Sequence, residues 1–213
     1  VSACTGIDAL AHALESAVTR KKCDLSNRHA RIAFQLLNQS LPMVFEDPNK
    51  IRARGGALLG ASHAGAAIEQ SMLGAAHSMA KTLTAKYGTI HGIAVGLALP
   101  WIMKFNMEEI ECRKIYANFA RVAGLCKDEC TDAEGAETLI NRVEELLRLA
   151  KISTYHHGLD FKKSAITELA VSASKQWTAG FNPRPIGCDD FEILYGQLFE
   201  NFSPAPRISV DLV

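Results

Sequence analysis

The sequence has no excess of charge of either sign, because 23 lysines and arginines balance 23 aspartates and glutamates. A chain without net charge has no bulk field that would attract nucleic acid or an anionic membrane surface. Long hydrophobic runs are also missing: the longest nearly apolar stretch, 92–103, is interrupted by Pro100 and falls short of the roughly 20 residues that span a bilayer. We therefore expect no nucleic-acid partner and no membrane segment.

Cysteine is present without the arrangement of a disulfide framework. The six cysteines are scattered along the chain and its first residues do not resemble a secretory leader, so we expect reduced thiols and a cytoplasmic location. Cys126 and Cys130 are four residues apart and could share a helical face. Because no second cluster of cysteine or histidine stands beside them, the sequence does not favour a metal or redox role for this pair.

The motifs of two common enzyme classes are missing as well. No Gly-x-Ser-x-Gly elbow presents a serine nucleophile, and no cysteine stands in a motif with a histidine, so a nucleophilic hydrolase is not indicated. No Gly-x-Gly-x-x-Gly turn joins a strand to a helix, and Gly55-Gly56 lies in an alanine-rich helical context. The sequence therefore predicts no dinucleotide-binding α/β domain within these 213 residues.

What the chain does contain is helical periodicity almost throughout, with 48% apolar residues. We predict one all-α domain over residues 1–213, a helical bundle with a loose tail at 203–213. Thr5 and Asp8 have the spacing of a capping box, which predicts a first helix over 6–20. Ser26 is expected to cap a second helix that precedes Pro42, and Asp47-Pro48 to open a third.

The rest of the chain continues in the same pattern. The small residues between 55 and 80 predict one or two helices buried in the middle of the bundle, with a break near Gly88. An extended turn at 182–185 is expected before the last helix. Further helices are predicted at 92–105, 108–123, 132–150, 162–173 and 189–199.

One carboxylate and three histidines are candidate metal ligands. Asp8 and His12 are four residues apart and would share one helix face, although such a pair alone is more typical of a surface hydrogen bond. His77 lies among small residues and would need a polar partner if buried, and His91 precedes an apolar helix. One carboxylate with three imidazoles suits Fe(II), Zn(II) or another first-row divalent ion.

The remaining four histidines are placed outside this site. His63 is interpreted as helix packing, although it lies 14 residues before His77, the same step that separates His77 from His91. The neighbouring His156 and His157 would diverge on a helix, so a surface turn is the expected setting for them and also for His29.

At this point three stretches resemble a known family. Residues 5–15 (TGIDALAHALE) are similar to the signature that opens the helical C-terminal domain of the iron-containing (group III) alcohol dehydrogenases, in the dehydroquinate synthase-like superfamily. Residues 72–80 (MLGAAHSMA) and 87–92 (YGTIHG) resemble the second signature, including the spacing of its two histidines. Residues 99–100, 105–106 and 182–184 fit later stretches, so the resemblance spans essentially the whole chain.

The resemblance implies a function as well as a fold. It makes Asp8, His12, His77 and His91 the ligands of Fe(II) or Zn(II), which would act as a Lewis acid on a small alcohol or aldehyde while NAD or NADP exchanges the hydride. Many members carry a histidine four residues after the third ligand, where this chain has Lys81. The proton relay and the cofactor contacts at that point are therefore in question. Lys81 is retained as a candidate catalytic and cofactor-binding residue, and a solvated or pyrophosphate-facing side chain is the alternative.

The resemblance also implies a missing partner domain. Family members have an N-terminal α/β nucleotide-binding domain, and the chain begins without Met, so we expect a piece of a longer enzyme that is inactive alone. The alternatives are a glycerol or polyol dehydrogenase, a dehydroquinate-synthase-like metalloenzyme domain, or a non-catalytic truncated oligomerisation module. A face that a missing domain would cover also predicts a homo-oligomer, most simply a dimer.

Overall fold

The computed structural model describes residues 2–152 and 162–200. In those ranges the chain is helical and contains no strand, which confirms the all-α prediction. The predicted tail at 203–213 and the pair His156 and His157 lie outside the described residues. The α-helices are α1 (Ser2–Val18), α2 (Asp24–Glu46), α3 (Ile51–Glu69), α4 (Ala75–Tyr87), α5 (His91–Asn106), α6 (Ile110–Val122), α7 (Asp132–Leu149), α8 (Ile166–Ser174) and α9 (Cys188–Glu200), with short 3₁₀ turns η2 (Lys163–Ala165) and η3 (Trp177–Phe181).

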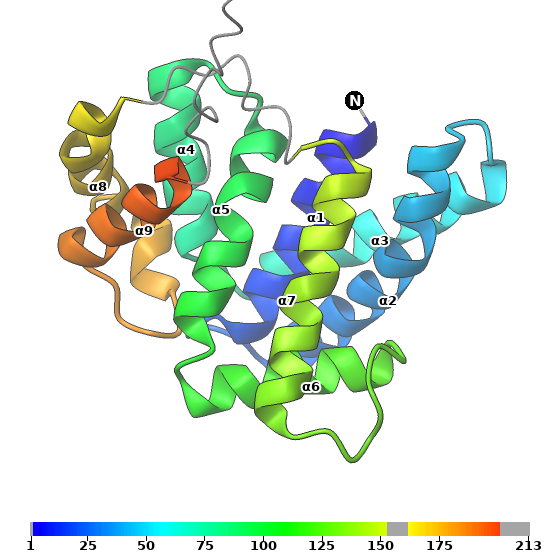
Figure 1. The fold of residues 1–213 in the computed structure, drawn as a ribbon. Helices are drawn as coiled ribbons and strands as arrows, with labels where there is room; N and C mark the ends of the chain where they lie inside the picture. The colour runs from blue at the N-terminus through cyan, green and yellow to red at the C-terminus, as the bar shows by residue number, and fades with distance from the viewer. Residues whose placement is uncertain (1, 153–161, 201–213) are drawn as a thin grey trace, which may run out of the picture.

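Helix α1 lies at the centre of the arrangement. It packs against α2 and α3 on one side and against α5 on the other, while α4, α8 and α9 form the opposite flank (Figure 1). Its apolar side chains are almost fully enclosed, as expected for a helix surrounded by others. At Gly92 the first turn of α5 approaches the α1 backbone so closely that a Cβ there would lie 2.1 Å from the carbonyl oxygen of Cys4.

The predicted start of α1 is wrong. The helix begins at Ser2, and Thr5 lies inside it with its hydroxyl donating to the Ser2 carbonyl at 3.4 Å. A threonine within a helix commonly bonds a carbonyl of the preceding turn, and Cys4 adds packing against the core that favours the extra turn. Asp8 is therefore not a capping residue, and its carboxylate is free to face a site.

Helix α2 differs from its prediction at both ends. Cys23 is the N-cap and Ser26 is the third helical residue, each side chain accepting from the other's backbone N–H. Pro42 lies within the helix, which continues to Glu46. A proline cannot bond the carbonyl four residues earlier, and here the Asn38 carbonyl accepts from the Arg142 guanidinium of α7 at 3.3 Å instead.

The alanine- and glycine-rich segment forms two helices with different surroundings. Helix α4 is buried as predicted, and it ends at Gly88, whose φ of 65° is the left-handed conformation typical of a helix end. Helix α3 is not buried in the middle of the bundle, because Ile51 and Leu58 are 82% and 74% exposed. Its small residues pack on one side only, where Gly60 leaves room for Leu37 of α2. It also begins at Ile51 and not at Pro48.

The later helices agree with the sequence to within a few residues, apart from one local feature. Helix α7 begins after Thr131, which forms a capping box with Glu134. Cys126 and Cys130 do not share a helical face, because both lie in the connection between α6 and α7. None of the helices in the described ranges combines the length and apolarity needed to cross a membrane.

Candidate metal centre

The four candidate ligands come from three helices, α1, α4 and α5, whose side chains meet at one site. Asp8 and His12 lie one turn apart on α1, and their Oδ2 and Nε2 atoms are 3.7 Å apart. His77 lies in the first turn of α4, and His91 is the first residue of α5. The structure therefore brings together side chains that are separated by up to 83 positions in the sequence.

The Asp8 carboxylate stands at the centre of the cluster. Its Oδ1 atom lies 3.4 Å from His77 Nε2 and 3.6 Å from His91 Nε2. One ligand atom from each of Asp8, His12 and His77 lies within 4.8 Å of the others, a spacing that a single cation can bridge. The rings of His12 and His77 are stacked with their centroids 5.0 Å apart, and those of His77 and His91 are tilted at 5.4 Å.

The donor atoms fit a divalent cation. Asp8 Oδ1 and His77 Nε2 are both buried and neither makes a hydrogen bond. Buried polar atoms normally have partners, so two such atoms facing each other indicate a position for a ligand that both can bind. A carboxylate oxygen and imidazole nitrogens are the donor types that Fe(II) and Zn(II) accept.

The charges in the cluster interact strongly. Burial acts to raise the pKa of Asp8, but the facing His77 and the neighbouring His12 and His91 outweigh it and hold the pKa below its ordinary value. Burial alone would lower the pKa of His77, but the carboxylates of Glu15 and Asp8 raise it to about 9. The two carboxylates thus favour a positive charge at His77, whereas the pKa values of His12 and His91 are lowered.

Glu15 is a residue of this site that the sequence analysis missed. It is 4% exposed, and its Oε2 is hydrogen-bonded to His77 Nδ1. Its Oε1 accepts from the backbone N–H of Ala76 at 2.8 Å. When Nδ1 donates to Glu15, Nε2 is the ring nitrogen left to face Asp8, so Glu15 fixes the orientation of His77 as carboxylates do for metal-binding histidines.

A signal for Glu15 was present in the sequence. Asp8, His12 and Glu15 follow one another at steps of four and three residues in an otherwise apolar helix, and they therefore lie on one face. Asn182, the first residue of the expected turn at 182–185, supports the same region. Its Oδ1 accepts from the Ala75 N–H at 3.3 Å, so the first two N–H groups of α4 are bonded by side chains distant in sequence.

Lys81 lies one turn after His77 on α4 and is not among the side chains that touch Asp8. Its Nζ stands 5.2 Å from the centre of the Trp177 ring, in cation–π contact. Its charge still reaches the cluster, because burial, His77 and Lys81 together outweigh Asp8 and lower the pKa of His91. Burial is also the first cause of the lowered pKa of His12.

The other described histidines form a separate pair. The Nδ1 atoms of His29 and His63 are 2.8 Å apart across α2 and α3. His63 is therefore part of helix packing, as predicted, and His29 lies in a helix and not in a surface turn. This pair is a natural control for experiments on the cluster.

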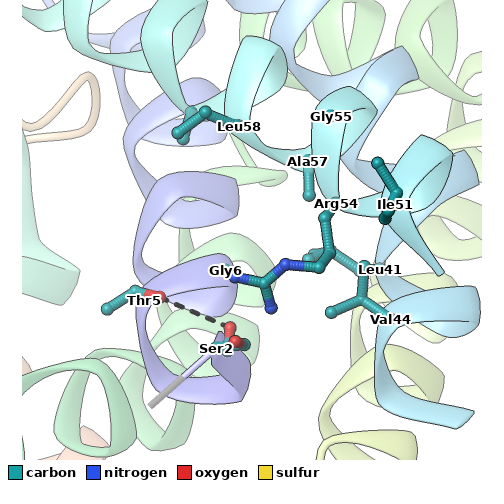
Figure 2. A pocket seen from close by; sticks show the side chains of 11 residues that line it. Ser2, Thr5, Gly6, Leu41, Val44, Ile51, Arg54, Gly55, Ala57 and Leu58 are labelled. Carbon is teal, nitrogen blue, oxygen red and sulfur yellow. Dashed lines mark hydrogen bonds between the residues drawn. The ribbon is translucent and has the colours of Figure 1, made fainter. Parts of the chain in front are cut away.

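A hollow of about 490 Å³ lies between the start of α1 and helices α2 and α3. Figure 2 shows Gly6 and Leu41 at its wall and the Arg54 side chain extending across it. None of the four candidate ligands lines this hollow. Its lining is largely apolar, so it offers no set of acid, base or metal-binding groups.

Comparisons with known proteins place this geometry in context. A family model described as Fe-containing alcohol dehydrogenase family, C-terminal, matches residues 2–199. The chain is 31% identical to the 1-propanol dehydrogenase PduQ of Citrobacter freundii, over 86% of this chain and 51% of that protein. It is 30% identical to the NADPH-dependent butanol dehydrogenase of Clostridium saccharobutylicum, over 92% of this chain and 50% of that protein.

Solved structures agree with these sequence matches. The crystal structure of a 1,3-propanediol oxidoreductase superimposes with a TM-score of 0.88 at 26% identity, over 93% of this chain and 52% of that chain. The chain therefore spans about half the length of the relatives it matches.

Proposed function

The chain belongs to the iron-containing alcohol dehydrogenase family, and from this premise we propose that it is the metal-binding part of an NAD- or NADP-dependent dehydrogenase of small alcohols and aldehydes. Asp8, His12, His77 and His91 hold the ion in this proposal. The observation that carries it is the meeting of these four side chains around two buried donor atoms without hydrogen bonds.

Each residue of the site has a separate role in this proposal. Asp8 supplies the negative charge at the centre, and Glu15 keeps Nε2 of His77 directed at it. When bound, the divalent ion supplies Lewis acidity toward the alcohol or carbonyl oxygen, and the nicotinamide cofactor supplies the hydride chemistry. The His91 side chain is 41% exposed while that of His77 is 2% exposed, so substrate approaches from the His91 side.

Lys81 is assigned to the same open side. Its charge acts on His91, and its contact with Trp177 holds the ammonium near the surface. In this position Lys81 contacts the anionic part of the cofactor and takes no part in binding the ion. The butanol dehydrogenase named above uses NADPH, as its name states, which supports a nicotinamide cofactor and leaves the choice between NAD and NADP open.

Metal analysis tests the ligand assignment. We expect one ion per chain after purification without chelators and loading with Fe(II) or Zn(II), and loss of that ion in His77→Ala and His91→Ala. His29→Ala and His63→Ala are matched controls, because those histidines lie outside the cluster, and both should retain the ion. A wild-type chain that binds no stoichiometric ion, or a His77→Ala/His91→Ala double variant that still binds it, would contradict the assignment.

Activity needs the second half of the enzyme in this proposal, because the relatives are about twice as long. We expect no turnover by the 213-residue chain with cofactor and alcohol, and turnover when a nucleotide-binding domain is supplied. Alcohols, polyols and hydroxy acids should be compared, since one matched structure is a propanediol oxidoreductase. A metal-loaded, complemented protein without any turnover would favour the non-catalytic module.

Self-association and a cytoplasmic location are further parts of the proposal. The exposed apolar residues Ile51, Leu58 and Leu59 of α3 support a homodimer, because such side chains are usually covered in a stable protein. Light scattering that finds a monomer independent of concentration would contradict it.

A further inference from the structure

Two cysteines outside the metal centre lie in direct contact. The Sγ atoms of Cys126 and Cys130 are 2.8 Å apart, and both residues are partly exposed free thiols. Sulfur atoms that are not bonded to each other rarely come so close, and a disulfide requires only that they move to about 2.05 Å. The connection between α6 and α7 therefore holds the two thiols in reach of one another.

The backbone around the pair is held by its own hydrogen bonds. After α6 the chain reverses at Gly124, whose φ is 68°, and the Leu125 N–H donates to the Ala120 carbonyl at 2.9 Å. The Cys130 N–H donates to the Lys127 carbonyl at 3.2 Å. The loop is therefore a folded turn in which the sulfur contact is part of the local structure.

Arg121 fixes the far end of the same loop. One of its guanidinium nitrogens donates to the Cys130 carbonyl at 2.7 Å and to the Asp132 carboxylate at 2.8 Å. The guanidinium thus connects the last turn of α6 to the first turn of α7. Closing a bond between the two sulfurs needs little movement of either helix.

The surroundings favour redox chemistry over metal binding. Within the described ranges, the only group of three or more acidic, cysteine or histidine ligands close enough to share an ion is the Asp8 cluster. Two thiols without a third ligand make a poor metal site, whereas two adjacent thiols suffice for a disulfide.

We propose that Cys126 and Cys130 form an oxidisable dithiol site that reacts with low-molecular-weight disulfides such as oxidised glutathione. One protein thiolate attacks a sulfur of the small disulfide, forming a mixed disulfide and releasing one small thiol. The second cysteine attacks the protein sulfur of that mixed disulfide, forms the Cys126–Cys130 bond and releases the second small thiol. Two protein thiols are oxidised, one small disulfide is reduced, and the two thiol protons end on the released thiols.

The environment of Cys126 affects the reactivity of its thiol. Burial, together with the Cys130 sulfur beside it, raises the pKa of Cys126 to about 11. Either sulfur can make the first attack, because the two sulfurs are in contact and both residues are partly exposed. The other sulfur then attacks the mixed disulfide and closes the Cys126–Cys130 bond.

Trypsin offers a direct assay, because Lys127 lies between the two cysteines and Arg121 and Arg142 flank them. The reduced chain yields separate peptides 122–127 and 128–142, and the disulfide holds them together in a non-reducing digest. After treatment with oxidised glutathione we expect the joined peptides to exceed glutathione adducts at these two cysteines by about tenfold or more, because the second thiol is already in place. Dithiothreitol should separate the peptides again.

Three variants sharpen the result. Cys126→Ser and Cys130→Ser should each leave a stable glutathione adduct on the remaining cysteine of the pair. Cys23→Ser is the matched control, since Cys23 is exposed and distant from this loop in sequence, and it should form the joined peptides as the wild type does. Wild-type protein that carries glutathione separately on Cys126 and Cys130, or that leaves both thiols free, would overturn the proposal.

Discussion

At the scale of single residues, Glu15 is the side chain whose removal tests the orientation of the cluster. In Glu15→Gln the amide oxygen can still accept from the Ala76 N–H, but the charge that holds the His77 Nδ1–H is lost. We expect affinity for Zn(II) to fall about 10- to 100-fold, the usual effect of losing such a partner. Competition with a chromophoric chelator measures it.

The control for this substitution is Glu144→Gln, which removes an exposed carboxylate paired with Lys104 on another part of the surface. Its affinity for Zn(II) should equal that of the wild type. Equal affinity in Glu15→Gln and wild type would show that Glu15 does not orient the ligand.

Cysteine reactivity gives a second test at this scale. Hydrogen bonds from the backbone N–H and the side-chain hydroxyl of Ser26 lower the pKa of the exposed Cys23. Burial raises the pKa of Cys112 to about 11. At about pH 8 only on the order of a thousandth of Cys112 is thiolate, the reactive form. We expect iodoacetamide to modify Cys112 at least about a hundredfold more slowly than Cys23.

Peptide mass spectrometry over time follows both sites in one sample. In denaturant the two rates should converge, because burial and the Ser26 contacts are lost together. Rapid modification of Cys112 in the native chain would contradict the buried position of its thiol.

Residue type and spacing in the sequence identified the candidate ligands. They did not reveal the hydrogen bond that orients His77. His77 and His91 stand in a recognisable motif, whereas the contact between Glu15 and His77 joins residues 62 positions apart. Thr5 shows the converse error: the capping-box pattern was present, but upstream packing extended the helix past it. Local sequence patterns indicate only the propensity of a segment. Tertiary contacts determined both the orientation of His77 and the start of α1.

At the scale of elements, the close approach of α5 to α1 determines where His91 stands. A Cβ at Gly92 would meet backbone atoms of Cys4, which cannot rotate away, so Gly92→Ala must push the start of α5 outward. We expect the free energy of unfolding to fall by about 1–3 kcal/mol, with weaker ion binding because His91 is the adjacent residue. Chemical denaturation and metal titration measure the two effects.

Gly55→Ala is the matched control, because Gly55 is also helical and nothing lies within 4 Å of a Cβ built there. It should leave stability unchanged or raise it by about 0.5–1 kcal/mol. If Gly92→Ala and Gly55→Ala had equal stability, the α1–α5 contact would accommodate the added methyl group without loss of stability.

Most helices could be predicted from hydrophobic periodicity and from the residues that cap or break helices. The predictions that failed did so for specific reasons. Gly88 and the Thr131–Glu134 capping box are local signals, and the structure follows both. Pro42 was read as following a helix, because the compensating guanidinium of Arg142 lies on a helix 100 residues later. For α3, small residues indicated close packing but not that only one side of the helix is packed.

At the scale of the whole molecule, an ion bound to α1, α4 and α5 would join three helices that the sequence keeps apart. Any ligand that binds only the folded state stabilises it, by about 2.7 kcal/mol at a hundredfold excess over the dissociation constant. We expect Zn(II) to raise the thermal unfolding midpoint and a chelator to reverse the rise. The same rise in His77→Ala would place the ion elsewhere, and His29→Ala should respond as the wild type does.

The hydrogen bond from Arg142 to the Asn38 carbonyl, the acceptor that Pro42 cannot bond, has a consequence for how this chain tolerates substitution. While Pro42 is present, the Asn38 carbonyl depends on the guanidinium of a distant helix, so losing Arg142 leaves a partly buried acceptor without this donor. Once an ordinary residue with its own N–H replaces Pro42, that dependence ends. The two positions are therefore epistatic: loss of Arg142 removes its bonds to the Asn38 side chain and to Glu145 in either order, but it leaves the Asn38 carbonyl without a donor only while Pro42 is present.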